Sequence, residues 1–444
     1  MSDDFPSSKF ERGKLVAKAG LKAGKNYAKY YVKKSLGGEE SGDLEKLHAQ
    51  NASDIYQELS KLRGTALKLA QSLSMDTGVL PEQFAEVMAN AQYSVPPMNR
   101  ALVRQRIKQE LGAYPEQLFK RFKGEAIAAA SLGQVHEAEL RDGRKVAVKI
   151  QYPNVRETIR SDMAMAKTIF KRLISGRNID DYFAEIYDKL LEETDYLLEG
   201  KQIEYFAGLY QTHPGIVTPR LVPELSTARV LTMTFVEGLH LEPFLKTGPA
   251  PAQRNTYGQI LWDFFHEQIC NEQYTIHADV HPGNFLFRED GRVGIVDFGC
   301  VKTFPEQFLN SFIQMIPAHL EEDQARILQL YYDTDILDRE AIGSQRNALF
   351  ADFFQQFGKT ILAPYLAGRF DFGEPAFREA LNAHFRKATT FTEIRGSRHY
   401  IFVNKVVIGL YSLLMQLGAV VETAHSRVIL EEAIGKFNAR ASEG

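Results

Sequence analysis

Two short polar segments constrain what this chain can fold into more than any other feature of its sequence. The first reads HADVHPGN from His277 to Asn284, and the second reads DFG from Asp297 to Gly299, directly after the apolar run VGIV. Carboxylate and amide oxygens are the ligands that hard Mg²⁺ ions prefer. A strand that ends at Asp297 would bring its carboxylate towards Asp279 and Asn284. The pattern therefore favours a site for a metal-bound polyphosphate.

The spacing within these segments matches the catalytic loop of kinases, which reads H-R-D-x-x-x-x-N and is followed by Asp-Phe-Gly. Asp279 and Asn284 are five positions apart, as in that loop, and Ala278 stands in the place of its arginine. We therefore expect Asp279 to orient or deprotonate the attacking group, and Asn284 and Asp297 to hold Mg²⁺. The alternative, that these are ordinary polar loop residues, leaves the spacing unexplained.

Three neighbouring features have simpler explanations. His277 and His281 flank Asp279, but the two cysteines of the chain are not in a zinc-ligand spacing, so we expect His277 to brace the loop. Cys300 is expected to be a small buried side chain. A second DFG begins at Asp371 with no β-rich run before it, and we interpret it as a chance repeat.

A β-hairpin with a lysine is predicted upstream. Two β-rich runs between residues 134 and 151 are joined by Asp142-Gly143, which is a strong hairpin signal. The second run contains VAVK, which matches the V-A-I-K of kinases and predicts that Lys149 binds nucleotide phosphates. The segment before the hairpin is expected to cover those phosphates, although alanine limits backbone approach more than glycine does. This segment consists of Ala128, Ala129, Ala130 and Ser131.

Lys149 needs an acidic partner, and the helix predicted for residues 180–202 offers three candidates. Asp195 and Glu199 are four positions apart and would share one helical face, whereas Glu193 would point elsewhere. Two like charges on one face repel each other unless a cation lies between them, and Lys149 and Mg²⁺ are the available cations. An ordinary acidic helix surface is the alternative.

The rest of the chain is predicted to be mostly helical. Pro223 would confine a strand at residues 221–225 to a sheet edge. Thr234 and Val236 lie where a hinge that contacts adenine would fall. The apolar run Val406–Val421 has 16 residues, fewer than the roughly 20 that cross a bilayer, so we expect a buried helix. Further helices are expected at about residues 44–75, 81–95, 100–111 and 154–174, with strands at about 229–235, 284–287 and 292–296.

Composition argues against several classes of protein. The 53 basic and 56 acidic side chains give a net charge of −3, so we expect no nucleic-acid partner. Two cysteines cannot build a disulfide framework, which indicates a reducing compartment, and we expect a cytoplasmic protein. Residues 9–34 carry a stripe of lysines that would suit an anionic membrane surface or an ordinary solvated face. Both alternatives stay open, and the first would place the protein on the inner face of a membrane.

These motifs together resemble those of the UbiB/AarF-domain atypical kinases, a family related to ubiquinone biosynthesis. Ala128–Ser131 is similar to the alanine-rich loop of that family, and Glu193-Thr194-Asp195 is similar to its E-x-D motif. Its K-x-G-Q signature is matched by Lys68-Leu69-Ala70-Gln71, with Ala70 in place of glycine. The resemblance covers about residues 50–300 and, more loosely, the C-terminal region.

The resemblance implies an α+β, bilobal, protein-kinase-like fold with a mostly helical C-lobe. It also implies an N-terminal helical extension, whose Lys68 and Gln71 lie over the active site and obstruct a polypeptide substrate. We accordingly expect a basic amphipathic segment and linker, the helical extension, a kinase-like N-lobe and a helical C-lobe. Their expected bounds are residues 1–43, 44–115, 116–236 and 237–444.

The function implied is that of an ATP-dependent atypical kinase or ATPase connected to isoprenoid-quinone or lipid metabolism. ATP or ADP with Mg²⁺ would be its cofactors, and a small molecule or lipid of unknown identity would be the acceptor. Two other functions stay open. One is a small-molecule phosphotransferase of the aminoglycoside or choline kinase type, which has a similar catalytic loop. The other is a non-catalytic nucleotide-binding scaffold.

Overall fold

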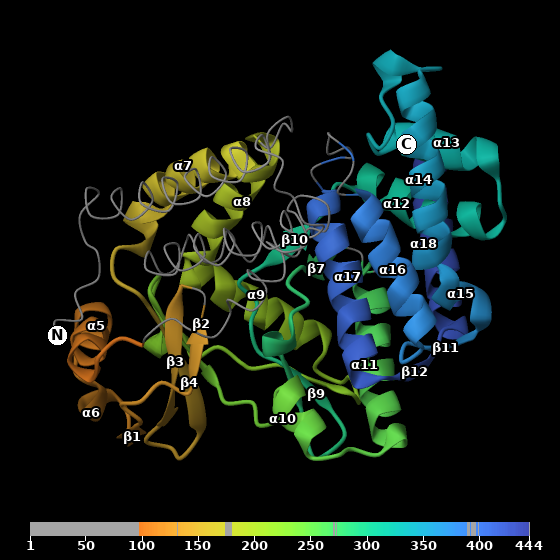
Figure 1. Cartoon of the computed structure of the whole chain (residues 1–444). Coiled ribbons are helices and arrows are strands. Elements are labelled where there is room, and N and C mark those ends of the chain that lie inside the picture. Colours follow the sequence, from red (N-terminus) through yellow and green to blue (C-terminus); the bar gives the residue numbers. More distant parts are fainter. Residues whose placement is uncertain are drawn as a thin grey trace, which may run out of the picture. The chain divides into compact units, whose positions relative to one another are not determined.

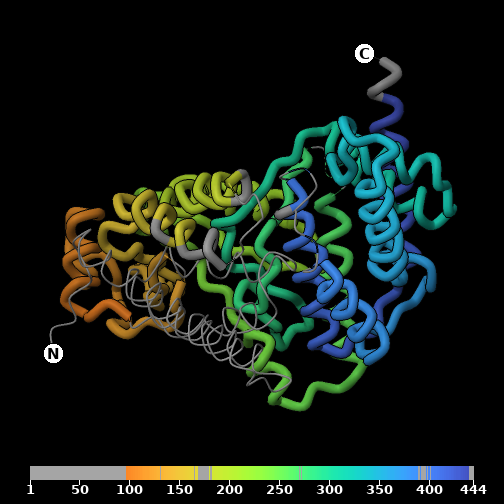
Figure 2. The backbone as a smooth tube through the Cα atoms, turned by 45° about the horizontal axis from the view of Figure 1, so that its top comes forward, coloured from red at the N-terminus to blue at the C-terminus, as the bar shows by residue number. Residues whose placement is uncertain are grey.

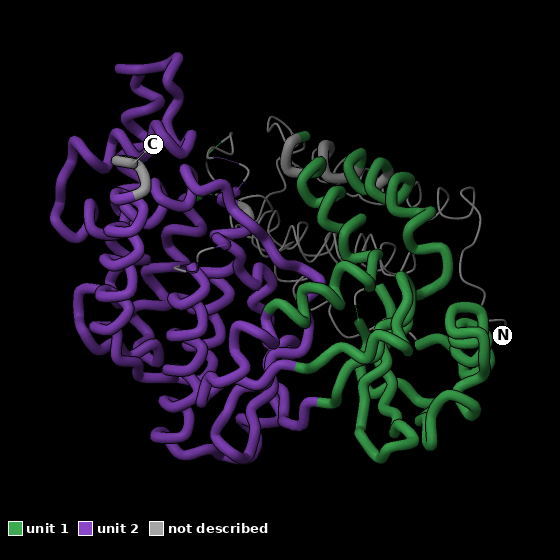
Figure 3. Tube along the Cα trace, turned by 180° about the vertical axis from the view of Figure 1, so that it is seen from behind, with its two compact units in different colours: residues 1–205, 219–235, 388–394 green, residues 206–218, 236–387, 395–444 purple. Residues whose placement is uncertain are grey.

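The computed structural model describes residues 97–443, except for 131, 174–179, 270, 272, 389–390, 392–396 and 398. The predictions for residues 9–34, Lys68, Gln71 and Ser131 therefore lie outside the described residues. The chain divides into two compact units (Figure 3). Among the described residues, unit 1 contains those up to Tyr205, Pro219–Phe235 and the neighbourhood of Ala388, and unit 2 contains the others.

Unit 1 is built around a five-stranded antiparallel sheet (Figure 1). Its strands follow the order β1-β3-β4-β6, and β2 also pairs with β3. The predicted hairpin is confirmed as β3 and β4, and Gly143 in its turn has a φ of 91°, which glycine adopts without strain. The strands are β1 (Arg121–Phe122), β2 (Ala128–Ala130), β3 (Gly133–Glu139), β4 (Lys145–Gln151) and β6 (Val230–Thr234).

Helices cover this sheet and connect its strands. The side chain of Asn99 accepts a hydrogen bond from the backbone of Leu102 and begins the first helix, which contributes Val103 and Ile107 to the core of the sheet. The single helix predicted for residues 180–202 is wrong, because the chain breaks at Thr194-Asp195 into two helices. The helices are α5 (Arg100–Leu111), α6 (Pro115–Leu118), α7 (Val155–Leu173), α8 (Asp180–Glu193) and α9 (Tyr196–Leu209).

The strand predicted for residues 221–225 is not formed. Leu221 makes only an isolated bridge to Met233, and η2 (Pro223–Leu225) is a turn of 3-10 helix. Proline has no backbone N–H to give to a ladder and its fixed φ suits the start of such a turn, which explains the difference. The segment Phe206–Thr218, which includes β5 (Ile216–Val217), clusters with unit 2.

Unit 2 is mainly helical, and three small sheets lie within it. The first joins β7 (Thr275–His277) to β10 (Val301–Thr303), and the second has the order β5-β9-β8. The third joins β11 and β12. The other strands are β8 (Phe285–Phe287), β9 (Val293–Ile295), β11 (Arg369–Asp371) and β12 (Val420–Glu422), and a 3-10 turn, η3 (Pro282–Asn284), precedes β8.

Two long helices of unit 2, α11 (Pro251–Ile269) and α17 (Tyr400–Leu417), lie side by side, as Figure 1 and the green and blue tubes of Figure 2 show. Trp262 of α11 is fully buried among aromatic side chains of this unit. The remaining helices are α10 (Leu241–Lys246), α12 (Glu306–Leu320), α13 (Gln324–Asp333), η4 (Arg339–Ala341), α14 (Gln345–Ile361), α15 (Ala363–Ala367), α16 (Pro375–Ala388) and α18 (Ala424–Glu443).

The apolar run Val406–Val421 is buried as predicted, but it is not one helix. Helix α17 stops at Leu417 because Gly418 is left-handed, with φ 56° and ψ 45°, and β12 follows. Within the described part of the chain, every helix is too short or too polar to cross a membrane. The second DFG is preceded by strand β11, contrary to the prediction, and Phe372 is a buried core residue.

Candidate active site

A buried ion pair in unit 1 joins Lys149 of β4 to Glu199 of α9. The Lys149 Nζ lies 2.8 Å from one carboxylate oxygen of Glu199 and 3.0 Å from the other. The two side chains are only 9% and 2% exposed, so the pair is almost completely removed from water. The Lys149 ammonium also lies 5.3 Å from the ring centre of Tyr196. The acidic partner predicted for Lys149 is therefore Glu199.

The break between α8 and α9 determines which acidic residue faces Lys149. Asp195 lies before α9, where its Oδ1 accepts a hydrogen bond from the backbone of Leu197 at 3.1 Å. Because Asp195 is outside the helix, the shared helical face predicted for Asp195 and Glu199 is not formed. Glu193 is the buried last residue of α8. A carboxylate that bonds the first free N–H groups of a helix stabilises the start of that helix, which gives Asp195 a structural role.

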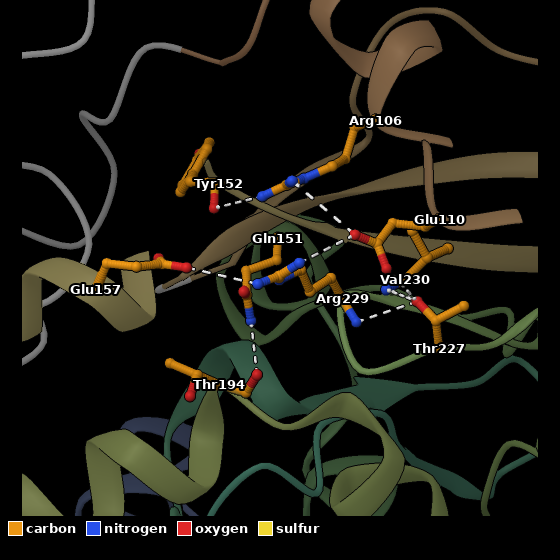
Figure 4. Close-up of polar contacts among 9 residues, drawn as sticks. All are labelled: Arg106, Glu110, Gln151, Tyr152, Glu157, Thr194, Thr227, Arg229 and Val230. Atoms are coloured by element: carbon orange, nitrogen blue, oxygen red, sulfur yellow. Dashed lines mark hydrogen bonds and ion pairs between the residues drawn. The ribbon is translucent and has the colours of Figure 1, made fainter. Parts of the chain in front are cut away.

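Gln151 holds this break against the sheet. Its Nε2 donates to the backbone oxygen of Thr194 at 2.9 Å (Figure 4), and Gln151 is 2% exposed. In addition, the backbone N–H of Tyr196 donates to the oxygen of Ala228 at 3.1 Å. Gln151 follows Lys149 by two positions on the same strand. One strand thus carries both the lysine and the side chain that fixes the start of the helix bearing Glu199.

A group of charged side chains surrounds Gln151 on its other side (Figure 4). Arg229 lies 3.5 Å from Glu110 and 3.5 Å from Glu157, and Arg106 lies 4.0 Å from Glu110. Burial lowers the pKa of the Arg106 guanidinium. Ion pairs at these distances near a surface contribute little to stability. The hydrogen bonds from Gln151 and from the backbone of Tyr196 are therefore the main contacts that hold the break between α8 and α9. Sequence reasoning missed Gln151, since a glutamine at the end of a strand is not a motif.

The alanine-rich segment forms a strand rather than a loop. Ala128–Ala130 is strand β2, and Ala130 pairs with Gly133 across a tight turn. A Cβ at Gly133 would lie 2.8 Å from the Tyr196 hydroxyl and still closer to the Ile150 carbonyl oxygen, so only glycine fits. Strand β3 therefore lies closer to β4, the strand that carries Lys149, than it could with any residue other than glycine at position 133. Sequence reasoning missed the role of Gly133.

In unit 2, His277 connects the first polar segment to the second. Its Nε2 donates to the backbone oxygen of Asp297 at 2.5 Å, and its backbone N–H donates to the side chain of Gln268 on α11 at 2.6 Å. The ring is 1% exposed, and burial lowers the pKa of His277, which keeps the imidazole neutral. The bracing role predicted for His277 is confirmed.

Hydrogen bonds hold the predicted site residues of the two polar segments. Asn284 Nδ2 donates to the backbone oxygen of Asp279 at 2.9 Å and to its Oδ2 at 3.2 Å. The backbone N–H of Val296 donates to the oxygen of Asn284 at 3.1 Å, and Asp297 Oδ1 accepts from the backbone of Gly299 at 2.8 Å. Hydrogen bonds thus join Asn284 to Asp279, and Val296, the residue before Asp297, to Asn284.

The residues predicted to hold Mg²⁺ are Asn284 and Asp297, whose amide and carboxylate oxygens are ligands of the kind that magnesium prefers. Because Asn284 Nδ2 bonds to Asp279, the amide oxygen of Asn284 is the atom that would hold a cation. Within the described residues, no three His, Cys, Asp or Glu side chains gather in a way that could hold a metal ion. Cys300 is a buried thiol, as predicted.

The predicted hinge residues lie where the chain passes from unit 1 to unit 2, between Phe235 and Val236. Thr234 ends β6, and its hydroxyl accepts a hydrogen bond from the backbone of Arg220 at 2.8 Å. Val236 is buried against Gly294 of β9, where a Cβ would lie 2.6 Å from a Val236 methyl group. Each hinge residue is therefore firmly held within its own unit.

Comparison with known proteins identifies the family. The family model for the ABC1 atypical kinase-like domain matches residues 90–331. The chain therefore belongs to this family of atypical kinases, which is the UbiB/AarF family that its motifs resemble. The matched range contains every predicted site residue except Lys68 and Gln71.

Two curated relatives and one solved structure illustrate the likeness. The chain is 31% identical to the mitochondrial atypical kinase COQ8 of Saccharomyces cerevisiae over 324 residues, 71% of this chain and 64% of the relative. It is 29% identical over 325 residues to the chloroplastic protein ACTIVITY OF BC1 COMPLEX KINASE 8 of Arabidopsis thaliana, covering 70% of this chain and 42% of the relative. The chain thus spans less than two thirds of either relative.

The solved structure is that of Rv3197 from Mycobacterium tuberculosis in complex with erythromycin. It superimposes with a TM-score of 0.59 at 27% identity, covering 88% of this chain and 97% of that protein. Together with the mixture of helices and sheets, this likeness supports an α+β kinase-like fold.

Proposed function

We propose that this protein is an ATP-dependent atypical kinase or ATPase that acts in isoprenoid-quinone or lipid metabolism. The observation that carries the proposal is the buried Lys149–Glu199 ion pair, with Nζ–Oε distances of 2.8 and 3.0 Å. A strand lysine paired with a helix glutamate is the arrangement that protein kinases require for nucleotide phosphates. Membership of the atypical kinase family supports the same conclusion.

Phosphoryl transfer depends mainly on positioning and charge neutralisation, which explains the residues proposed for it. Lys149 binds the α- and β-phosphates, and Glu199 keeps its ammonium in place. Asn284 and Asp297 hold Mg²⁺, which neutralises phosphate charge when it is bound. Asp279 orients or deprotonates the attacking group, and the Asn284 amide bonded to its carboxylate restricts its rotation.

The remaining predicted residues have supporting roles in this proposal. The hairpin that contains Ala128–Ser131 covers the phosphates, and Thr234 and Val236 contact the adenine end. Glu193 and Asp195 shape the start of helix α9. Lys68 and Gln71 lie over the nucleotide and favour a small acceptor, and residues 9–34 bind an anionic membrane surface.

A single-turnover assay with γ-labelled ATP separates catalysis from binding. Nucleotide affinity is measured in parallel with a fluorescent ADP, with and without Mg²⁺. We expect Asp279→Asn to bind nucleotide normally and to turn over about 10²- to 10⁴-fold more slowly, since it loses a general base or orienting carboxylate. Asp297→Asn should lose the gain in affinity that Mg²⁺ provides. Equal turnover in the wild type and both variants would contradict these roles, and binding without turnover in the wild type would identify a scaffold.

The class of acceptor is tested by ADP release in the presence of different compounds. Lipid or quinone-like phenols are compared with aminoglycosides and choline, each with and without anionic liposomes. We expect stimulation by the phenols or by liposomes. Stimulation by aminoglycosides or choline alone would instead identify a small-molecule phosphotransferase, and a variant with neutralised lysines in residues 9–34 tests the membrane contribution.

A further inference from the structure

Helix α17 lies in close contact with the catalytic loop at Gly409. Gly409 of α17 is buried, and a Cβ built on it would lie 2.9 Å from the Cβ of Val280 and still closer to the Val280 carbonyl oxygen. Val280 follows Asp279 directly, and it is 5% exposed. The absence of a side chain at Gly409 therefore determines how closely the helix approaches the loop that carries Asp279.

Both ends of α17 are anchored elsewhere in unit 2. At its C-terminal end, Arg254 of α11 donates to the Leu417 oxygen at 3.0 Å, and a Cβ at Gly258 would lie 2.5 Å from that of Ala419. At its N-terminal end, the Lys302 ammonium of β10 lies 4.6 Å from the ring centre of Phe402. A helix held at both ends cannot move away easily from a residue that presses on its middle.

The other side of the loop is held by α11 and β10. Gln268 of α11 accepts the backbone hydrogen bond of His277 at 2.6 Å, and the backbone N–H of Ala278 donates to the Cys300 oxygen at 2.8 Å. These contacts fix the residues before Asp279. The contact with Gly409 fixes the residue after it, so Asp279 lies between two supports.

We propose that Gly409 is a positioning residue for the phosphoryl-transfer reaction and that α17 is the rigid support that sets the position of Asp279. This inference rests on the proposed function. Helix α17 lies beyond the residues that the family model matches, so no motif of the nucleotide site includes it.

The size of the effect follows from the geometry of the contact. A methyl group at Gly409 would lie about 1 Å inside the 3.4 Å at which ordinary van der Waals contact begins. Because α17 is anchored at both ends, and the bonds from α11 and β10 hold the residues before Asp279, we expect the backbone from Asp279 to Val280 to shift. A displacement of about 1 Å in a catalytic group lowers the rate by about 10²-fold. Nucleotide affinity should stay within about threefold, since the heavy atoms nearest to a Cβ at Gly409 all belong to Val280 and not to a residue proposed to bind phosphate or metal.

The test compares Gly409→Ala with a matched steric variant, Gly358→Ala. Both add one methyl group to a helical glycine, but the atoms nearest to a Cβ at Gly358 of α14 belong to the ring of His319 of α12, at 2.8 Å, and not to α17 or the catalytic loop. Both full-length proteins are assayed for single-turnover ATP consumption, nucleotide affinity and thermal unfolding. We expect Gly409→Ala to lose about 10²-fold in rate constant with unchanged affinity, and Gly358→Ala to lose stability with a rate constant near that of the wild type.

Hydrogen exchange gives a readout that does not depend on activity. Amides in residues 278–284 should exchange faster in Gly409→Ala and at the wild-type rate in Gly358→Ala. Equal loop exchange in the two variants, or equal losses of rate in proportion to stability, would overturn the inference. A wild type without turnover would refute the proposed function alone, because the exchange comparison still decides whether α17 holds the loop.

A second pair of variants applies if Gly409→Ala does not fold. Val280→Ala removes two methyl groups beside α17 without a clash, and Val421→Ala removes the same groups at a position 1% exposed in β12. We expect a rate loss of at least threefold and faster loop exchange only in Val280→Ala. The same behaviour in both valine variants would overturn the inference.

Discussion

Removing the carboxylate of Glu199 should destabilise unit 1 strongly. In Glu199→Gln the Lys149 ammonium, 9% exposed, loses an anion that is 2% exposed. Breaking a buried ion pair by removing one partner costs roughly 3–5 kcal/mol, because the remaining charge is left without compensation. Each 1.4 kcal/mol is a factor of ten, so the local opening equilibrium should shift by about 10²-fold or more.

Hydrogen exchange of peptides that cover β4 and α9 measures this shift directly. The only tryptophan of the chain, Trp262, lies in unit 2, so its fluorescence would report on the other unit. We expect exchange at least 10²-fold faster in Glu199→Gln. The double variant Lys149→Met/Glu199→Leu should regain most of the protection, since an apolar pair of similar volume often replaces a buried ion pair without loss.

Activity should follow a different pattern from stability in these variants. The double variant is expected to have no ATP turnover, although it should keep most of the stability of the wild type. Unchanged exchange in Glu199→Gln would show that the ion pair is compensated by other groups. Full activity in the double variant would refute the proposed role of Lys149.

Two further perturbations test the packing around the site. Burial lowers the pKa of His266 to about 4, so protonation favours unfolding, and up to about 3 kcal/mol of stability should be lost as the pH falls from 6.5 to 4. His266→Gln should lose less stability than the wild type over that pH range, with unfolding followed by the fluorescence of the adjacent Trp262. Identical pH profiles of stability for the two proteins would contradict this. Gly133→Ala should destabilise unit 1 by about 1–3 kcal/mol, because the added methyl group would press on the Ile150 oxygen. Gly435→Ala is the control, since a Cβ there has no neighbour within 4 Å. Equal unfolding midpoints for the two variants would contradict this prediction.

Local sequence patterns determined much of the local structure and of the candidate site of this protein. The catalytic-loop spacing, the Asp142-Gly143 turn and the lysine in VAVK each depend on residues close together in the chain. Such patterns act through turn geometry and side-chain alternation, which need no distant partner. For this reason the hairpin, the two strands before Asp297 and the brace from His277 could all be predicted.

Tertiary packing decided the features that the sequence left open or that were predicted wrongly. The break at Thr194-Asp195 is held by Gln151, a residue 43 positions away, and this break selects Glu199 as the partner of Lys149. Helical periodicity alone cannot show such a break, because the bond that holds it comes from a strand of the sheet.

The contact between Gly409 and Val280 joins parts of the chain that no local pattern connects. The sequence by itself showed a glycine in an apolar helix and a catalytic loop far upstream. Only the packing of α17 against the loop brings them together, since close approach depends on the shapes of two surfaces and not on either sequence alone.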